Sequence, residues 1–199
     1  MSISEDGLRK NQANFASLSP LSFLERTRKT FPNQTAIEYK DYKLSYKQAG
    51  QRCDALANLI KNQNFNSGST IAVMLPNIPV MWECHFGVPM ATGVLNAINT
   101  RLDSHTVQFI LEHGEAKLFI YDSEYSPIVE KALVNLKNPP TVIEFVDEVA
   151  GNKRSNFANK VNCLDYETEL KNFTGTTFEH VLPNDEWNSI ALNYTSGTT

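Results

Sequence analysis

The feature that most constrains the fold is a regular alternation of short apolar runs and helix-like segments between residues 70 and 146. Four apolar runs, at residues 70–75, 94–98, 117–121 and 141–146, have the length and side chains of buried strands. Segments with helical patterns separate them, and the connections are short. Strand and helix in this order build a parallel sheet covered by helices on both faces. We therefore predict an α/β fold with a mostly parallel sheet.

The helices between these runs are bounded by residues that start or stop a helix. The first is expected over residues 78–92, and the third over residues 126–136. The second can be capped by Asp103 or Ser104 and ends at Gly114.

The N-terminal part is less regular. Residues 1–17 are polar and aperiodic, and we expect a loose lead-in to a domain formed by residues 18–199. A short helix over residues 21–29 follows, with Ser19 as its N-cap and Pro20 at the first helical position.

Three further segments complete the outline. Residues 35–39 and 43–45 are predicted to form a small hairpin. Residues 46–62 are predicted as an amphipathic helix, because apolar residues recur there at helical spacing. These residues are Ala49, Cys53, Leu56, Ala57 and Ile60. Residues 147–188 should form loops and a short edge strand or helix before the chain returns to the core at Ser189.

Composition excludes several functional classes. Lys and Arg number 18 against 22 Asp and Glu, and with no basic cluster nucleic acid is not expected as a partner. Three widely spaced cysteines, Cys53, Cys84 and Cys163, are typical of reduced thiols in the cytoplasm. The longest apolar stretch, residues 71–98, is interrupted by prolines and polar residues, so no membrane span is expected.

The last ten residues are the strongest candidate for a functional site. An apolar run from Ile190 breaks into four hydroxyl residues around one glycine, as at the end of a buried strand that leads into an anion-binding loop. The loop residues are Thr195, Ser196, Gly197, Thr198 and Thr199. A Ser/Thr-rich turn without a ligand is the equally weighted alternative. No Gly-x-x-x-x-Gly-Lys-Ser/Thr or Gly-x-Gly-x-x-Gly pattern occurs, which argues against a P-loop kinase or a standard dinucleotide-binding domain.

Other reactive residues favour structural roles. Cys84 and His85 are adjacent on a predicted helix, where neighbours diverge by about 100°, so a nucleophile and base pair is not expected. The four histidines show no metal-ligand spacing, and no metal site or catalytic residue is assigned.

An aromatic stripe also has two interpretations. Trp82, Phe86 and Met90 recur at helical spacing, which is typical of a core face, with the wall of an acyl channel as the alternative. By the same reasoning, Tyr46 and Phe109 are expected in the core.

Four stretches together resemble one known family. Residues 194–199 read Tyr-Thr-Ser-Gly-Thr-Thr, which resembles the first half of the Tyr-Thr-Ser-Gly-Thr-Thr-Gly-x-Pro-Lys-Gly signature of the AMP-forming acyl-activating enzymes. Residues 44–49 are similar to the family's Thr-Tyr-x-Glu-Leu entry to its first long helix, and residues 71–77 to its strand and Pro-Asn turn. Residues 87–102 are similar to the segment that ends in its Asn-x-Arg-Leu turn, and most resemble members that act on short-chain, medium-chain or aromatic acids.

The resemblance implies the fold and the reaction. The fold would be an incomplete portion of the large N-terminal domain of acyl-CoA synthetases. A carboxylate and ATP would give an acyl-adenylate and pyrophosphate, with Mg²⁺ as cofactor, and coenzyme A would then take the acyl group. In this family the loop at Thr195, Ser196, Gly197, Thr198 and Thr199 holds the ATP phosphates. Arg101 matches a position near the coenzyme A nucleotide, although a surface ion pair is the alternative for a single arginine after a strand.

The chain also departs from the family pattern. The Gly-x-Pro-Lys-Gly half of the loop and the segments that follow it in the family are missing, so we expect this fragment to be inactive by itself. A folded remnant or interaction module without catalysis is a second hypothesis, and transfer of the acyl group to a carrier protein or to oxygen is a third. An unpaired strand edge and an apolar face should be exposed, and should make the isolated chain poorly soluble.

Overall fold

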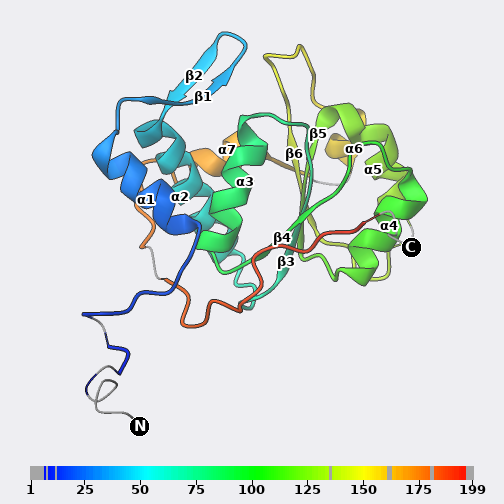
Figure 1. The fold of residues 1–199 in the computed structure, drawn as a ribbon. Helices are drawn as coiled ribbons and strands as arrows, with labels where there is room; N and C mark the ends of the chain where they lie inside the picture. Colours follow the sequence, from blue (N-terminus) through cyan, green and yellow to red (C-terminus); the bar gives the residue numbers. More distant parts are fainter. Residues whose placement is uncertain are drawn as a thin grey trace.

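A parallel sheet of five strands forms the centre of the structure (Figure 1). The computed structural model of the chain describes residues 7, 9–11, 13–134, 136–160, 163–179 and 182–195. The spatial order of the strands is β4-β3-β5-β6-β7, and each neighbouring pair is parallel. The strands are β3 (Thr70–Met74), β4 (Val94–Ala97), β5 (Leu118–Asp122), β6 (Thr141–Phe145) and β7 (Leu164–Asp165). The predicted α/β fold with a mostly parallel sheet is therefore confirmed.

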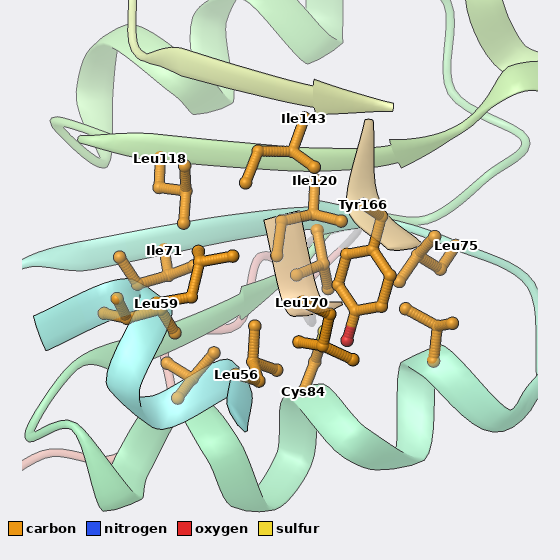
Figure 2. Close-up of a cluster of buried hydrophobic side chains, with 14 of the residues drawn as sticks. Leu56, Leu59, Ile71, Leu75, Cys84, Leu118, Ile120, Ile143, Tyr166 and Leu170 are labelled. Atoms are coloured by element: carbon orange, nitrogen blue, oxygen red, sulfur yellow. The ribbon is translucent and has the colours of Figure 1, made fainter. Parts of the chain in front are cut away.

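Helices cover both faces of this sheet, as predicted. Cores form on both faces because successive side chains of a strand point to opposite sides: Ile71 and Ile120 join one core, while Ala72 and Phe119 join the other. Figure 2 shows the first core, which packs between the sheet and the helices of its face. Those helices are α2 (Tyr46–Asn62), α3 (Pro79–Met90) and α7 (Tyr166–Lys171), and the opposite core receives side chains from α4 (Ser104–His113), α5 (Ser126–Leu133) and α6 (Asn156–Lys160).

The helix α2 has the predicted bounds because its start is fixed by local hydrogen bonds. The Gln48 amide donates to Ser45 Oγ over 3.3 Å, and the Ser45 amide donates to Gln48 Oε1 over 2.9 Å. This reciprocal arrangement is a capping box. The five apolar positions predicted to face the core are all buried: Ala49, Cys53, Leu56, Ala57 and Ile60.

The predicted hairpin precedes this helix. Strand β1 (Thr35–Tyr39) pairs in antiparallel fashion with β2 (Tyr42–Ser45), and Lys40 in the turn has a positive φ of 52°. Before the hairpin, α1 spans Leu21–Thr30, whereas an N-cap at Ser19 would make Pro20 its first residue. Pro20 occupies the N-cap position, so the assignment of that role to Ser19 is wrong, although Ser19 Oγ still accepts a 3.3 Å bond from the Leu21 amide.

Differences elsewhere concern mainly the ends of elements. The helices predicted to reach residues 92 and 136 end at Met90 and Leu133. The irregular region contains the expected short edge strand, because Leu164 of β7 pairs with Ile143 of β6. Within the residues described, no helix is both long and apolar enough to cross a membrane.

Candidate functional site

The segment at residues 190–192 lies along the open edge of β4 (Figure 1). The Leu95 amide donates to the Ile190 carbonyl over 3.0 Å, and the Leu192 amide donates to the Leu95 carbonyl over 2.8 Å. The buried Asn96 side chain adds a 3.2 Å bond from Nδ2 to the Leu192 carbonyl. Ala191 forms a parallel bridge with Leu95, so the segment is paired like the start of a further parallel strand.

This segment is not the buried strand that the sequence predicted. Ser189 and Ala191 are exposed, and Ile190 is 42% exposed, so the prediction that the chain returns to the core at Ser189 is wrong. The physical reason is the position of the segment outside β4, where only one neighbouring strand pairs with it among the residues that the structure describes.

Tyr194 fixes the segment to the end of α4. Its hydroxyl lies 2.7 Å from His113 Nδ1, and the His113 ring stacks on Phe109 with centroids 5.3 Å apart. The Tyr194 ring packs edge-on against both rings, at centroid distances of 5.7 and 6.4 Å. Gly114 permits this approach, since a Cβ at that position would lie 3.3 Å from the Tyr194 hydroxyl and 2.9 Å from the Ile110 carbonyl. We call Phe109, His113 and Tyr194 the aromatic clasp.

The protonation of Tyr194 suits its role as a donor. Partial burial raises the pKa of Tyr194, so the phenol keeps its proton at neutral pH. His113 accepts this hydrogen bond at Nδ1 in the tautomer that carries its ring proton on Nε2.

The structure places only one residue of the predicted phosphate loop. Thr195 follows Tyr194 and is exposed. The other four, Ser196, Gly197, Thr198 and Thr199, lie outside the described residues. The phosphate contacts of the loop therefore stay a prediction.

Arg101 lies in the turn after β4 and is exposed. Its amide donates to Asn99 Oδ1 over 3.0 Å. No salt bridge involves Arg101 within the described part of the chain. Since Arg101 and Thr195 both follow the carboxyl ends of adjacent parallel segments, they emerge toward the same edge of the sheet, where ligands of open α/β sheets bind.

A separate cavity of about 430 Å³ lies beside the hairpin, between the start of α3 and the residues that follow β6. A charged network lines it. Arg52 Nε donates to Glu83 Oε1 over 2.5 Å, and Nη2 donates to Glu167 Oε1 over 2.5 Å. The Tyr166 hydroxyl donates to Glu83 Oε2 over 2.8 Å. Figure 2 shows Tyr166 in the apolar core with its hydroxyl directed toward α3.

The Glu83 side chain is fully buried, and its environment opposes ionisation. Burial raises its pKa, while Arg52 and Tyr166 lower it without cancelling the effect of burial. In the sequence, Glu83 is one of the polar residues that interrupt the apolar stretch at residues 71–98. A carboxylate on an otherwise apolar helix is a detectable signal of a buried network, because it needs a partner when buried.

Cys84 and His85, which are neighbours on α3, lie in different environments. Cys84 is buried, and burial raises the pKa of its thiol well above the ordinary value. His85 is exposed, and its Nδ1 lies 2.8 Å from the Met81 carbonyl. The described residues contain no group of three His, Cys, Asp or Glu side chains that could hold a metal ion.

The aromatic stripe belongs to the core. Met90 is buried, and Trp82 and Phe86 pack against its cluster as partly buried side chains, as does Tyr46. The expectation for Phe109 is wrong, because this residue is 52% exposed. Phe109 lies on α4 where its ring contacts Tyr194. Tyr194 comes 85 positions later in the sequence, so helical spacing gives no information about this contact.

These features define a class of protein. A parallel α/β sheet with an added edge segment is an open architecture of the kind that binds ligands at its carboxyl edge, and Thr, Ser and Gly follow this segment in the sequence. Residues 24–199 match the model of the AMP-binding enzyme family. The chain belongs to this family.

Several plant proteins are similar in sequence. An acetate–CoA ligase of Humulus lupulus is 37% identical over 201 residues, which are 98% of this chain and 35% of the relative. A peroxisomal acetate/butyrate–CoA ligase of Arabidopsis thaliana is 36% identical over 202 residues, again 98% of this chain and 35% of the relative. A peroxisomal trans-cinnamate:CoA ligase of Petunia hybrida is 37% identical over 207 residues, with 98% and 36% covered. The chain thus spans little more than a third of the length of these relatives.

Solved structures show the same fold. The crystal structure of the anthranilate CoA ligase AuaEII in complex with anthranoyl-AMP matches 96% of this chain and 35% of that chain, with a TM-score of 0.80 and 20% identity. Coronafacic acid ligase from Pectobacterium brasiliense matches 89% of this chain and 33% of that chain, with a TM-score of 0.71 and 12% identity. The fold is therefore that of the N-terminal part of acyl-CoA ligases.

Proposed function

We propose that the chain is the N-terminal part of an ATP-dependent acid–CoA ligase. A carboxylate oxygen would attack the α-phosphorus of ATP, forming the acyl-adenylate as the bond to pyrophosphate breaks. The thiolate of coenzyme A would then displace AMP from the acyl carbon. Such a reaction needs a crowded polyanion held in place, and positioning with charge screening contributes most to phosphoryl and nucleotidyl transfer.

The observation that carries this proposal is the anchoring of Tyr194 at the start of the family motif. Pairing with β4 and the contact with His113 place Thr195 at the edge of the sheet. Thr195, Ser196, Gly197, Thr198 and Thr199 would then bind the ATP phosphates through hydroxyl and backbone N–H donors. Arg101, exposed after the adjacent strand and without a described ion pair, is available for the anionic nucleotide of coenzyme A.

The described residues do not provide a magnesium site of their own. In the proposed enzyme the ion would be bound by ATP phosphates and by residues other than these.

The substrate class comes from the relatives. Acetate, butyrate, 2-methylpropanoate, trans-cinnamate and benzoate appear in their names, so a short-chain or aromatic acid is proposed here. A medium-chain acid, from the sequence resemblance, belongs to the same proposal. A cytoplasmic location is proposed from the reduced cysteines, with the peroxisome as the alternative that the relatives' names suggest.

A binding role without catalysis is the second candidate. Leu18 is 75% exposed, Trp187 92% and Ile190 42%, and the pairing edge of β4 lies beside Ile190. Apolar side chains near an incompletely covered strand edge favour association with another polypeptide. Transfer of the acyl group to a carrier protein is a variant of the first proposal and would use the same loop.

Two measurements test these proposals. Titration of the 199-residue chain with tripolyphosphate should show binding that Gly197→Val abolishes, with Ser67→Val as a control in an exposed turn. Pyrophosphate release from ATP should then be measured with the carboxylates named above, both for this chain and for the complete reading frame. Sustained turnover by the 199-residue chain would contradict the expected inactivity of the fragment, and absence of turnover by the complete frame would overturn the ligase proposal.

A further inference from the structure

The contact between α4 and the terminal segment lies at the margin of a buried core, against which Tyr194 packs as a partly buried side chain. Phe109 and His113 are exposed, and neither belongs to the buried cluster that α4 forms with the sheet. An exposed phenylalanine normally needs no explanation, but here its ring stacks on His113 and meets the edge of Tyr194. Phe109 and His113 therefore contact the terminal segment rather than the core beneath α4.

We propose that His113 is a positioning residue, which holds Tyr194 and thereby sets the direction in which Thr195 and the phosphate loop leave the sheet. This inference rests on the proposed function, since it names the residue that orients the proposed loop. His113 would not itself touch ATP.

The aromatic clasp is the last described contact that holds the terminal segment before the proposed loop. The main-chain pairing involves Leu95 and ends at the Leu192 amide. Asn96 adds one bond to the Leu192 carbonyl. Beyond that point the Tyr194 hydroxyl bond to His113, at 2.7 Å, is the next contact along the described chain. Thr195 follows it directly.

The clasp also limits rotation of the tyrosine. The stacked pair at 5.3 Å holds the His113 ring, whose plane lies at 77° to that of Tyr194. The close approach at Gly114 fits the hydroxyl against the end of the helix. A single surface hydrogen bond would leave Tyr194 free to turn, whereas a hydrogen bond combined with two edge-on ring contacts fixes its direction.

The test separates the hydrogen bond from the ring. His113→Phe keeps an aromatic ring on Phe109 but removes Nδ1, while His113→Asn places a polar atom near the Nδ1 position without the ring. His105→Asn is the matched control, because His105 lies exposed on the same helix. Tyr194→Phe removes the hydroxyl from the other side of the contact.

Two quantities are measured on the 199-residue chain. The first is hydrogen exchange of the Leu192 amide, which donates to Leu95. The second is the dissociation constant of tripolyphosphate. His113→Phe should lower protection and weaken binding by about threefold to tenfold each, as for one net hydrogen bond. His113→Asn should recover part of both losses, and His105→Asn should change neither.

The double variant completes the test. Because both substitutions remove the same bond, His113→Phe with Tyr194→Phe should lose no more protection than either alone. Additive losses, or exchange and binding in His113→Phe that equal the wild type, would overturn the positioning role. If the wild type binds no tripolyphosphate, the proposed phosphate loop fails. Exchange at Leu192 still decides whether His113 holds the segment.

Discussion

Replacement of Arg52 by methionine should destabilise the fold strongly at neutral pH. The substitution leaves Glu83, whose side chain is 0% exposed, with the Tyr166 hydroxyl as its described hydrogen-bond donor. Removal of one partner from a buried ion pair costs about 3–5 kcal/mol, because the other charge is left uncompensated. Glu167→Gln removes the more exposed partner of Arg52, at 41% exposure, and should cost only about 0.2–1 kcal/mol.

The pH dependence of this loss has a defined sign. The pKa of Glu83 in the folded protein lies above the ordinary value, chiefly because of burial, so the ionised carboxylate destabilises the folded state. This penalty is absent below the unfolded pKa and grows as pH rises through the folded pKa. Without Arg52 the folded pKa rises further, and the difference between variant and wild type should therefore increase between about pH 5 and pH 8.

Urea unfolding followed by circular dichroism measures both effects. Arg52→Met with Glu83→Gln is the control, since the double variant has no carboxylate at this position and its stability difference should lose the pH dependence. A loss for Arg52→Met no larger than for Glu167→Gln, or equal losses at both ends of the pH range, would refute the assignment of a buried charge to Glu83.

Three further changes test the packing and the local structure. Ser45→Ala should cost about 1 kcal/mol in urea unfolding, because it removes the cap of α2; an unchanged midpoint would contradict the capping box. Gly87→Ala should cost about 1–3 kcal/mol despite the better helix propensity of alanine, since the new Cβ would lie 2.8 Å from Leu56 Cδ2; a stabilised variant would show that α2 and α3 can separate at little cost. Cys53 and Cys84 should react with a thiol reagent only after unfolding, because both are buried with thiol pKa values raised well above normal; rapid labelling of the native chain would contradict this.

Hydrophobic pattern was sufficient to predict the sheet and most helices. The strands around Ile71 and Leu118 are buried on both faces and read as continuous apolar runs, which is typical of central parallel strands. The bounds of α2 were predictable because Ser45 and Gln48 determine its start locally. Helix ends without such a signal, at residues 92 and 136, were placed two or three residues too far.

The charged networks of the structure were not predictable in the same way. Glu83 meets Arg52 from another helix, 31 positions away, and Glu144 in β6 is likewise buried and accepts a 3.0 Å bond from the Tyr121 hydroxyl. Each acid lies within an apolar run, where its charge looks like an interruption. Its partner depends on how helices and strands pack, and sequence spacing carries no information about that.

The candidate site shows why a motif can be recognised while its surroundings are misjudged. The letters from Tyr194 to Thr199 are local and identify the family, but burial of the preceding segment depends on what lies beyond β4. Residues 189–191 are exposed where they pair with β4, and exposed pairing of this kind opens at low free energy. The position of Thr195 then depends on a few specific contacts, of which the bond to His113 lies nearest in the chain. In the proposed ligase, a loop that holds a polyanion at a fixed distance from a reacting carboxylate would gain from such an anchor, because misplacement by about 1 Å can cost a hundredfold in rate.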